Sequence, residues 1–225
     1  MVRLVLFDID GTLIRTGGAG VRAFGRTAEL LFGQAGAAER MTFHGRTDTG
    51  LVREFFRKHG IQDSLENVRH FLDTYVFLLD HLLEQHSGET LPGVHQFIAE
   101  LRRLPQPPTI GLLTGNIRLG AEIKLRAHGL WEEFVLGGFA DDHDSRNEIA
   151  RVARDRGSQF IGRELDGDEI VVIGDTPLDV ECARAIGARC LAVATGAFTV
   201  AELDLHGPQW ATTDLTLLHP REVCD

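Results

Sequence analysis

The sequence has few cysteines, fewer basic than acidic residues and no long apolar run. Its three cysteines show no Cys-x-x-Cys spacing, so neither a disulfide framework nor a zinc knuckle is expected. Lys and Arg number 23 against 33 Asp and Glu, a formal charge of −10 that argues against a surface for nucleic acid or anionic membranes. No apolar run approaches the roughly 18 to 20 residues that a bilayer span needs. Acidic residues near the N-terminus exclude a secretory h-region, so we expect a cytoplasmic protein.

The apolar share of the sequence is large enough for a buried core. Apolar residues make up 43% of 225 positions, too many for a disordered chain. Short aliphatic runs that lack polar alternation, as strands buried on both faces do, occupy residues 2–7, 109–113, 169–174 and 188–194, with a weaker run at 134–139. Helical patterns alternate with these runs. The alternation predicts an α/β fold with a Rossmann-like parallel sheet flanked by helices.

Residues 16–88 interrupt this alternation with three apolar patterns of helical period. The patterns comprise Val21, Phe24, Ala28 and Leu31; Leu51, Val52, Phe55 and Phe56; and Leu65, Val68, Leu72, Tyr75, Leu79 and Leu82. A loop of this length without structure of its own is uncommon in a compact domain. We therefore expect an all-α domain over 16–88, inserted after the first strand of a core formed by 1–15 and 89–225.

Acidic and hydroxyl side chains directly follow three of the predicted strands. Asp8 and Asp10 follow the first, Thr114 follows the second, and Asp175 and Asp179 follow the third. A lone Asp or Thr after a strand is usually a cap or a turn former. Ligands of parallel α/β sheets, however, bind outside the carboxyl ends of the strands, so these side chains are expected at one rim. Their clustering indicates a hard divalent cation, and Mg²⁺ suits carboxylates combined with a substrate phosphate.

The same residue types suit phosphoryl transfer. A carboxylate such as Asp8 can attack phosphorus and form an aspartyl-phosphate. The Thr114 hydroxyl and the amides that begin the next helix can cradle the phosphate. An EF-hand is excluded, because the twelfth position counted from Asp8 is Ala19 rather than Glu.

With these residues, the chain resembles the haloacid dehalogenase-like (HAD) hydrolase superfamily, in its phosphatase branch with a type 1 helical cap. The family's first motif is matched by residues 4–12, LVLFDIDGT, and its second by residues 112–116, LLTGN. Its fourth motif is matched by residues 174–179, GDTPLD. Order and spacing agree over nearly the whole chain, and the insertion falls where that cap falls.

The resemblance implies roles by position. Asp8 would be the nucleophile and a ligand of Mg²⁺. Asp10 would be the general acid/base, with its backbone carbonyl on the metal. Thr114 and the Gly115 amide would bind phosphate, and Asp175 would be a further metal ligand.

Two further positions complete the implied site. Asp179 would support the metal ligands without binding the ion. The family's third motif, a Lys, has no exact match; Arg146 stands there by spacing, and a guanidinium binds phosphate bidentately and stays charged. Lys124 is the other candidate, but its place in the middle of a predicted helix favours a solvated helix face. Arg146 is therefore preferred.

The insertion contains a segment, residues 43–48, that reads FHGRTD between two helical patterns. Its Gly-Arg-Thr-Asp string resembles the cap loop of phosphoglycolate phosphatase-like members. Arg46 could bind a carboxylate or a second anionic group of a small substrate. The alternative is a capping turn, with Thr47 or Asp48 as the N-cap of a helix over 49–58 and Arg46 in solvent.

Several activities are compatible with these motifs to different degrees. A dehalogenase is disfavoured, because its leaving halide needs no proton and Asp10 is present. A sugar-phosphate mutase keeps all four motifs and stays open, as do a non-catalytic binding protein and a receiver-like phospho-Asp module. We expect Mg²⁺-dependent hydrolysis of a small phosphorylated metabolite by a monomer or homodimer, without a nucleic-acid or membrane partner.

Overall fold

The computed structural model describes residues 1–85 and 88–225, and its main sheet has six strands. The spatial order is β5-β4-β1-β6-β7-β8, and every neighbouring pair is parallel. The strands are β1 (Leu4–Phe7), β4 (Thr109–Leu113), β5 (Leu136–Gly138), β6 (Ile170–Gly174), β7 (Arg189–Val193) and β8 (Trp210–Thr212). All five predicted runs contain a strand, and β8 is an addition at the edge. The predicted α/β fold is confirmed.

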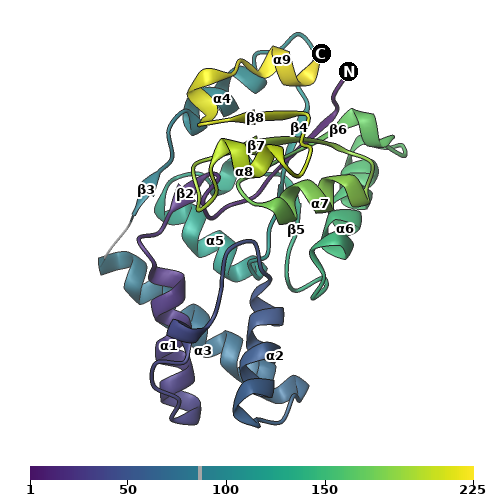
Figure 1. The fold of residues 1–225 in the computed structure, drawn as a ribbon. Helices are drawn as coiled ribbons and strands as arrows, with labels where there is room; N and C mark the ends of the chain where they lie inside the picture. The colour runs from purple at the N-terminus through teal and green to yellow at the C-terminus, as the bar shows by residue number, and fades with distance from the viewer. Residues whose placement is uncertain (86–87) are drawn as a thin grey trace.

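Helices cover both faces of this sheet (Figure 1). They are α4 (Val94–Leu101), α5 (Arg118–Ala127), α6 (Arg146–Ile161), α7 (Pro177–Ala185), α8 (Val200–Asp204) and α9 (Pro220–Cys224). Along β1, Val5 and Phe7 belong to the apolar cluster that contains residues of α4, α5 and α9. Leu4 and Leu6 belong to the cluster that contains residues of α6 and α7. Burial on both faces explains why β1 is apolar at every position.

Three helices lie apart from the sheet, in the lower half of Figure 1. They are α1 (Ala19–Phe32), α2 (Asp48–His59) and α3 (Leu65–Gln85). Their shared core is aromatic: the ring of Phe24 lies 4.8 Å from that of Phe71 and 6.0 Å from that of Phe55. The boundaries expected for the helical domain, 16 and 88, stay a prediction, and residues 86–87 within that range lie outside the described residues.

Two residues of the three apolar patterns are exposed rather than buried in the structure. Val21 is 39% exposed and Leu65 is 83% exposed. Helix α1 turns the face that carries Ala23 and Phe24 inward instead. Leu65 is the first residue of α3, before the point where the helix is covered by its neighbours. The periodicity of apolar residues predicted the helices correctly, but not every residue of the periodic patterns lies on the buried face of its helix.

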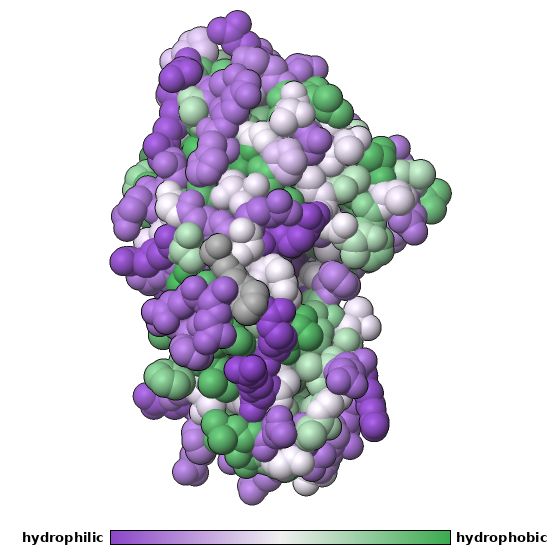
Figure 2. Space-filling model, turned by 90° about the vertical axis from the view of Figure 1, so that its left-hand side faces the viewer, coloured by the Kyte–Doolittle hydropathy of each residue, from purple (hydrophilic) through white to green (hydrophobic). Residues whose placement is uncertain are grey.

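A two-stranded antiparallel ribbon joins the sheet to the three helices. It pairs β2 (Ile14–Arg15) with β3 (Glu89–Thr90), so both chain crossings lie side by side. Arg15 and Glu89 form an ion pair of 2.8 Å across it. Figure 2 shows the molecule narrowing between the two parts, with a largely hydrophilic face and scattered apolar patches. Among the described residues, no helix combines the length and apolar character that crossing a membrane requires.

Candidate active site

The carboxyl ends of the central strands bring three acidic side chains together. Phe7 of β1 pairs in register with residues of both β4 and β6, so the residues that follow these strands lie at one edge. The backbone N–H of Asp8 donates to the carbonyl of Ile173 at 2.9 Å. Carboxylate oxygens of Asp8, Asp175 and Asp179 all lie within 4.8 Å of one another. The strand-end pattern in the sequence therefore corresponds to a real cluster.

This acidic cluster is deeply buried and fits a hard divalent cation. Asp8, Asp175 and Asp179 are exposed by 4% or less. Burial raises the pKa of Asp8 to about 6, although the nearby Arg146 guanidinium opposes the shift. Burial and the charges of Asp179 and Asp8 raise the pKa of Asp175 well above its usual value. Hard divalent cations prefer carboxylate oxygens as ligands. Because the negative charges of Asp8 and Asp175 are not fully compensated by the protein, these two residues could bind such a cation.

Asp179 differs from the other two because both of its carboxylate oxygens are occupied. The backbone N–H and the hydroxyl of Thr176 donate to Oδ2 at 3.0 and 2.7 Å, and Oδ1 forms an ion pair with Arg146. Gly174 makes this packing possible, since a Cβ there would lie 2.1 Å from Cγ of Asp179. Asp179 is therefore placed to support the cluster, in line with its predicted role.

Arg146 lies beside the nucleophile candidate. It is the first residue of α6 and is buried, with Nη2 at 3.3 Å from Oδ2 of Asp8. Its Nη1 donates to the carbonyl of Gly45, in the loop before α2, at 3.2 Å. Among the described residues, its buried Nε has no hydrogen-bond acceptor. The guanidinium charge beside Asp8 suits the predicted contact with phosphate.

Lys124 is also buried, contrary to the expectation of a solvated helix face. Its exposed fraction is 4%, and its Nζ lies 2.6 Å from Oδ2 of Asp10. The burial arises because helix α1 passes over this part of α5. A Cβ on Gly20 of α1 would lie 3.7 Å from Nζ of Lys124 and 3.5 Å from the hydroxyl of Tyr75. The sequence pattern of α5 alone does not contain this tertiary contact.

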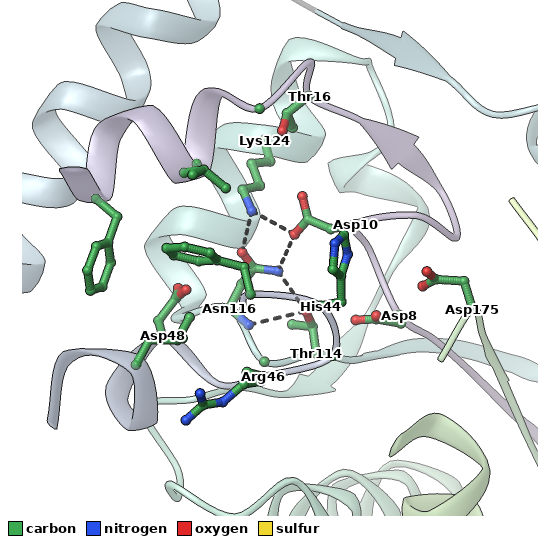
Figure 3. A pocket seen from close by; sticks show the side chains of 18 of the residues that line it. Asp8, Asp10, Thr16, His44, Arg46, Asp48, Thr114, Asn116, Lys124 and Asp175 are labelled. Atoms are coloured by element: carbon green, nitrogen blue, oxygen red, sulfur yellow. Dashed lines mark hydrogen bonds and ion pairs between the residues drawn. The ribbon is translucent and has the colours of Figure 1, made fainter. Parts of the chain in front are cut away.

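Asn116 links Asp10 to Thr114. Its side-chain amide nitrogen donates to Oδ2 of Asp10 and to Oγ1 of Thr114, both at 2.8 Å. Its amide oxygen accepts from Nζ of Lys124 at 2.6 Å. Figure 3 shows this network at the side of the pocket that holds Asp10. Sequence reasoning assigned Asn116 no role, although its position two residues after Thr114 at a strand end was a usable signal.

The loop before α2 docks directly on the loop after β4. The backbone N–H of Asp48 donates to the carbonyl of Gly115 at 2.7 Å, and a Cβ on Gly115 would lie 2.2 Å from the carbonyl oxygen of Arg46. The Asp48 carboxylate in turn accepts from the N–H of Ile117 at 2.9 Å. Gly115 is therefore required by the close approach of this loop, whatever else its amide binds.

The capping turn that was the alternative for this loop is present. Thr47 is the N-cap of α2 and accepts from the N–H of Gly50 at 3.2 Å. Arg46 is not free in solvent: its guanidinium forms an ion pair with Glu54, and 32% of its side chain is exposed. Arg46 nevertheless lines the cavity, so its predicted contact with substrate stays a prediction.

A cavity of about 180 Å³ joins these groups. Its sheet side contains Asp8, Asp10, Thr114, Gly115, Arg146 and Asp175. Its helical side is lined by Val21, Phe24, Phe43, His44, Arg46, Asp48 and Tyr75. In Figure 3 Asp8, Asp10 and Asp175 come from the sheet edge, and His44 lies near them from the opposite loop. A small molecule held by its anionic end at the sheet would contact the three-helix part with its remainder.

The fold and the site together define an enzyme with clustered carboxylates at the carboxyl edge of a parallel sheet. The chain belongs to the haloacid dehalogenase-like hydrolase family, whose model matches residues 5–193. The predicted family and hydrolase class are thereby confirmed.

Similar proteins carry compatible names. The protein named "Probable phosphatase IndB" from Dickeya dadantii is 28% identical over 93% of this chain and 88% of its own length. A protein named as a candidate pyrophosphatase, PpaX of Caldanaerobacter subterraneus, is 26% identical over 100% of this chain and 96% of its own. The crystal structure of CbbY from Rhodobacter sphaeroides with phosphate has a TM-score of 0.78 and 20% identity, covering 99% of both chains. That structure supports the fold, and the sequence relatives support a phosphatase.

Proposed function

We propose that this protein is a Mg²⁺-dependent phosphomonoesterase that acts on a small phosphorylated metabolite through an aspartyl-phosphate on Asp8. The observation that carries the proposal is the buried cluster in which oxygens of Asp8, Asp175 and Asp179 lie within 4.8 Å of one another, beside Arg146. Asp8 and Asp175 would hold the metal, together with the backbone carbonyl of Asp10. When bound, Mg²⁺ would neutralise charge on the phosphate oxygens and on these carboxylates.

In the first step, a carboxylate oxygen of Asp8 attacks phosphorus and the bond between phosphorus and the ester oxygen breaks. A pKa of about 6 leaves Asp8 largely ionised at neutral pH, as a nucleophile requires. Asp10 gives its proton to the departing oxygen, so the product leaves as a neutral alcohol. Thr114, the Gly115 amide and Arg146 bind the oxygens of the transferred phosphoryl group.

In the second step, water attacks phosphorus of the aspartyl-phosphate. Asp10, now ionised, takes the proton of that water, and the bond between phosphorus and the Asp8 oxygen breaks. Inorganic phosphate leaves, and both carboxyl groups return to their starting states. Asp10 thus acts as acid and then as base, while Asp179 keeps Arg146 in place beside Asp8.

The proposal is tested by measuring phosphate release from a panel of phosphorylated metabolites with Mg²⁺ and with a chelator. Wild type should release phosphate from at least one ester when Mg²⁺ is present, and Asp8→Asn should abolish this release. Asp155→Asn is the matched control, because Asp155 lies on α6 with 59% of its side chain exposed. Unchanged turnover by Asp8→Asn would contradict the mechanism. Phosphoryl transfer back to the product, without phosphate release, would favour the mutase.

A further inference from the structure

The sequence contains two lysines among its 23 basic residues, and they lie in opposite surroundings. Lys58 is on the surface of α2, with 48% of its side chain exposed and an ion pair to Glu54. Lys124 keeps 5% of its side chain exposed, and its Nζ lies 2.6 Å from both Asp10 Oδ2 and Asn116 Oδ1. Burying an ammonium is costly unless its partners compensate it, so this placement calls for an explanation.

The contacts of Asp10 are asymmetric. Its Oδ2 atom receives donors from both Lys124 and Asn116, at 2.6 and 2.8 Å. The side chain of Asp10 is 42% exposed, and Asp10 lines the cavity. Anchoring one oxygen of a carboxyl group fixes the direction in which the other oxygen points. A group that passes a proton needs such alignment, because misplacement of about 1 Å can cost on the order of 100-fold in rate.

The two buried cations therefore serve different carboxyl groups. Arg146 lies against Asp8 and Asp179, on the α6 side of the site. Lys124 lies against Asp10 and Asn116, beneath α1. Within residues 1–85 and 88–225, Arg146 and Lys124 share no hydrogen-bond or ion-pair partner. The cation beside Asp8 is therefore a different residue from the cation beside Asp10.

We propose that Lys124, with Asn116, is a positioning residue that aims Asp10 at the oxygen of the leaving alcohol. This inference rests on the proposed function, because it assumes that Asp10 protonates a leaving group. A compact ammonium fits a buried site between two acceptors better than the larger planar guanidinium used elsewhere in the chain. In this arrangement Arg146, the cation beside Asp8, would bind the phosphate, and Lys124 would not be needed for that contact.

The experiment compares kcat/KM for two esters whose leaving groups differ in their need for a proton. Dinitrophenyl phosphate leaves as a stable phenolate, whereas the best alkyl ester of the metabolite panel must be protonated as it leaves. The parameter kcat/KM reports steps up to the first irreversible one, so the second step does not enter. Lys124→Met should lower kcat/KM for the alkyl ester by about 100-fold and for dinitrophenyl phosphate by less than about 3-fold.

Controls separate positioning from folding. Lys58→Met removes the exposed lysine and should leave both esters unaffected. Lys124→Gln keeps a hydrogen-bond donor and a polar side chain, so it should fold and show the same selective loss with a smaller magnitude. Thermal unfolding of each variant identifies any that is not folded.

The outcomes separate the role of Lys124 from the proposed phosphatase activity. A selective loss for the alkyl ester supports the role of Lys124. Equal losses for both esters in folded Lys124→Gln, or no loss in either variant, overturn the inference and leave the proposed function standing. Failure of the wild type to hydrolyse either ester with Mg²⁺ overturns both.

Discussion

Nη2 of Arg146 lies 3.3 Å from Oδ2 of Asp8, and the same guanidinium forms an ion pair with Asp179. One buried cation therefore compensates two buried carboxylates that come from different parts of the chain. The pKa of Asp8 is raised by burial to about 6, and Arg146 is the main group that opposes the rise. The nucleophile candidate consequently stays ionised at neutral pH while being shielded from water.

Replacing Arg146 by Met should damage both stability and activity. The change leaves Asp8 and Asp179 without their buried counter-charge, which typically costs about 3–5 kcal/mol of unfolding free energy. We expect kcat/KM to fall by at least about 100-fold, because a charged donor beside the reacting phosphoryl group is lost. Urea unfolding and steady-state kinetics measure the two effects. Arg154→Met is the control on the same helix, since Arg154 contacts the exposed Asp155. A folded Arg146→Met enzyme with near wild-type kcat/KM would contradict this account.

Asp48→Asn should change how stability depends on pH. Burial raises the pKa of Asp48 in the folded state to about 6, from an ordinary value of 3.8. Below pH 4 the carboxyl is protonated in both states. Between pH 4 and 6 the unfolded chain loses the proton first, so the contribution of Asp48 to stability declines as pH rises through 6.

The Asn variant removes this decline, and its amide oxygen can still accept from the N–H of Ile117. We expect it to gain about 1–2 kcal/mol over wild type at pH 7 and to gain little at pH 4, after allowance for partial exposure. Urea unfolding at a series of pH values measures the difference. Asp73→Asn is the control, because 72% of the Asp73 side chain is exposed on α3. If the unfolding free energies of wild type and Asp48→Asn change in parallel with pH, Asp48 does not cause the decline in stability above pH 4.

Mg²⁺ should stabilise the folded protein through Asp175. Binding at a concentration of 100 times Kd adds about 2.7 kcal/mol, which raises Tm by roughly 5–10 °C for a chain of this size. Asp175→Asn should lose this increase. It should also raise Tm without metal, because the strongly raised pKa of Asp175 reflects an unfavourable buried charge next to Asp179 and Asp8. Differential scanning calorimetry with Mg²⁺ or chelator provides the measurement. An equal metal-induced rise in the variant would place the metal elsewhere.

Arg46→Ala tests the part of the cavity formed by the helical insertion. Arg46 lines the cavity and is fixed by Glu54, so it could bind an anionic group beyond the phosphate. We expect KM for the best metabolite to rise about 10-fold, and KM for a generic aryl phosphate to change less than about 2-fold. Arg53→Ala is the control on α2, as Arg53 pairs with Asp63 and Asp144. Equal changes in KM for both substrates would contradict a contact between Arg46 and the metabolite, and would indicate that Arg46 only stabilises the loop.

The cluster of acidic residues at the carboxyl edge of the sheet could be predicted from the sequence, because two local features occur together there. Short aliphatic runs identified the strands, and parallel strands end at a common edge, so Asp8 and Asp175 could be placed together without coordinates. The sequence also offered Thr47 or Asp48 as the N-cap of the next helix, and Thr47 is the one that caps α2.

The burial of Lys124 could not be predicted from the residues around it in the sequence. Its place in the middle of α5 was interpreted as a solvated helix face, but Lys124 is buried, and Gly20 of α1, from another part of the chain, lies close to its Nζ. The same limitation affected Val21, whose helix was predicted but whose buried face was not. Contacts between the helical insertion and the sheet domain depend on tertiary packing that no window of sequence contains.

The central claim is that Asp8 forms a covalent bond to phosphorus, and trapping that intermediate tests it most directly. Enzyme mixed with excess substrate and Mg²⁺ is quenched in acid during turnover, digested and analysed by mass spectrometry. The account predicts a phosphoryl group on Asp8 in the peptide that follows β1, and its absence in Asp8→Asn. A phosphoryl group on a different residue, or rapid turnover with no phosphorylated peptide at any quench time, would contradict it.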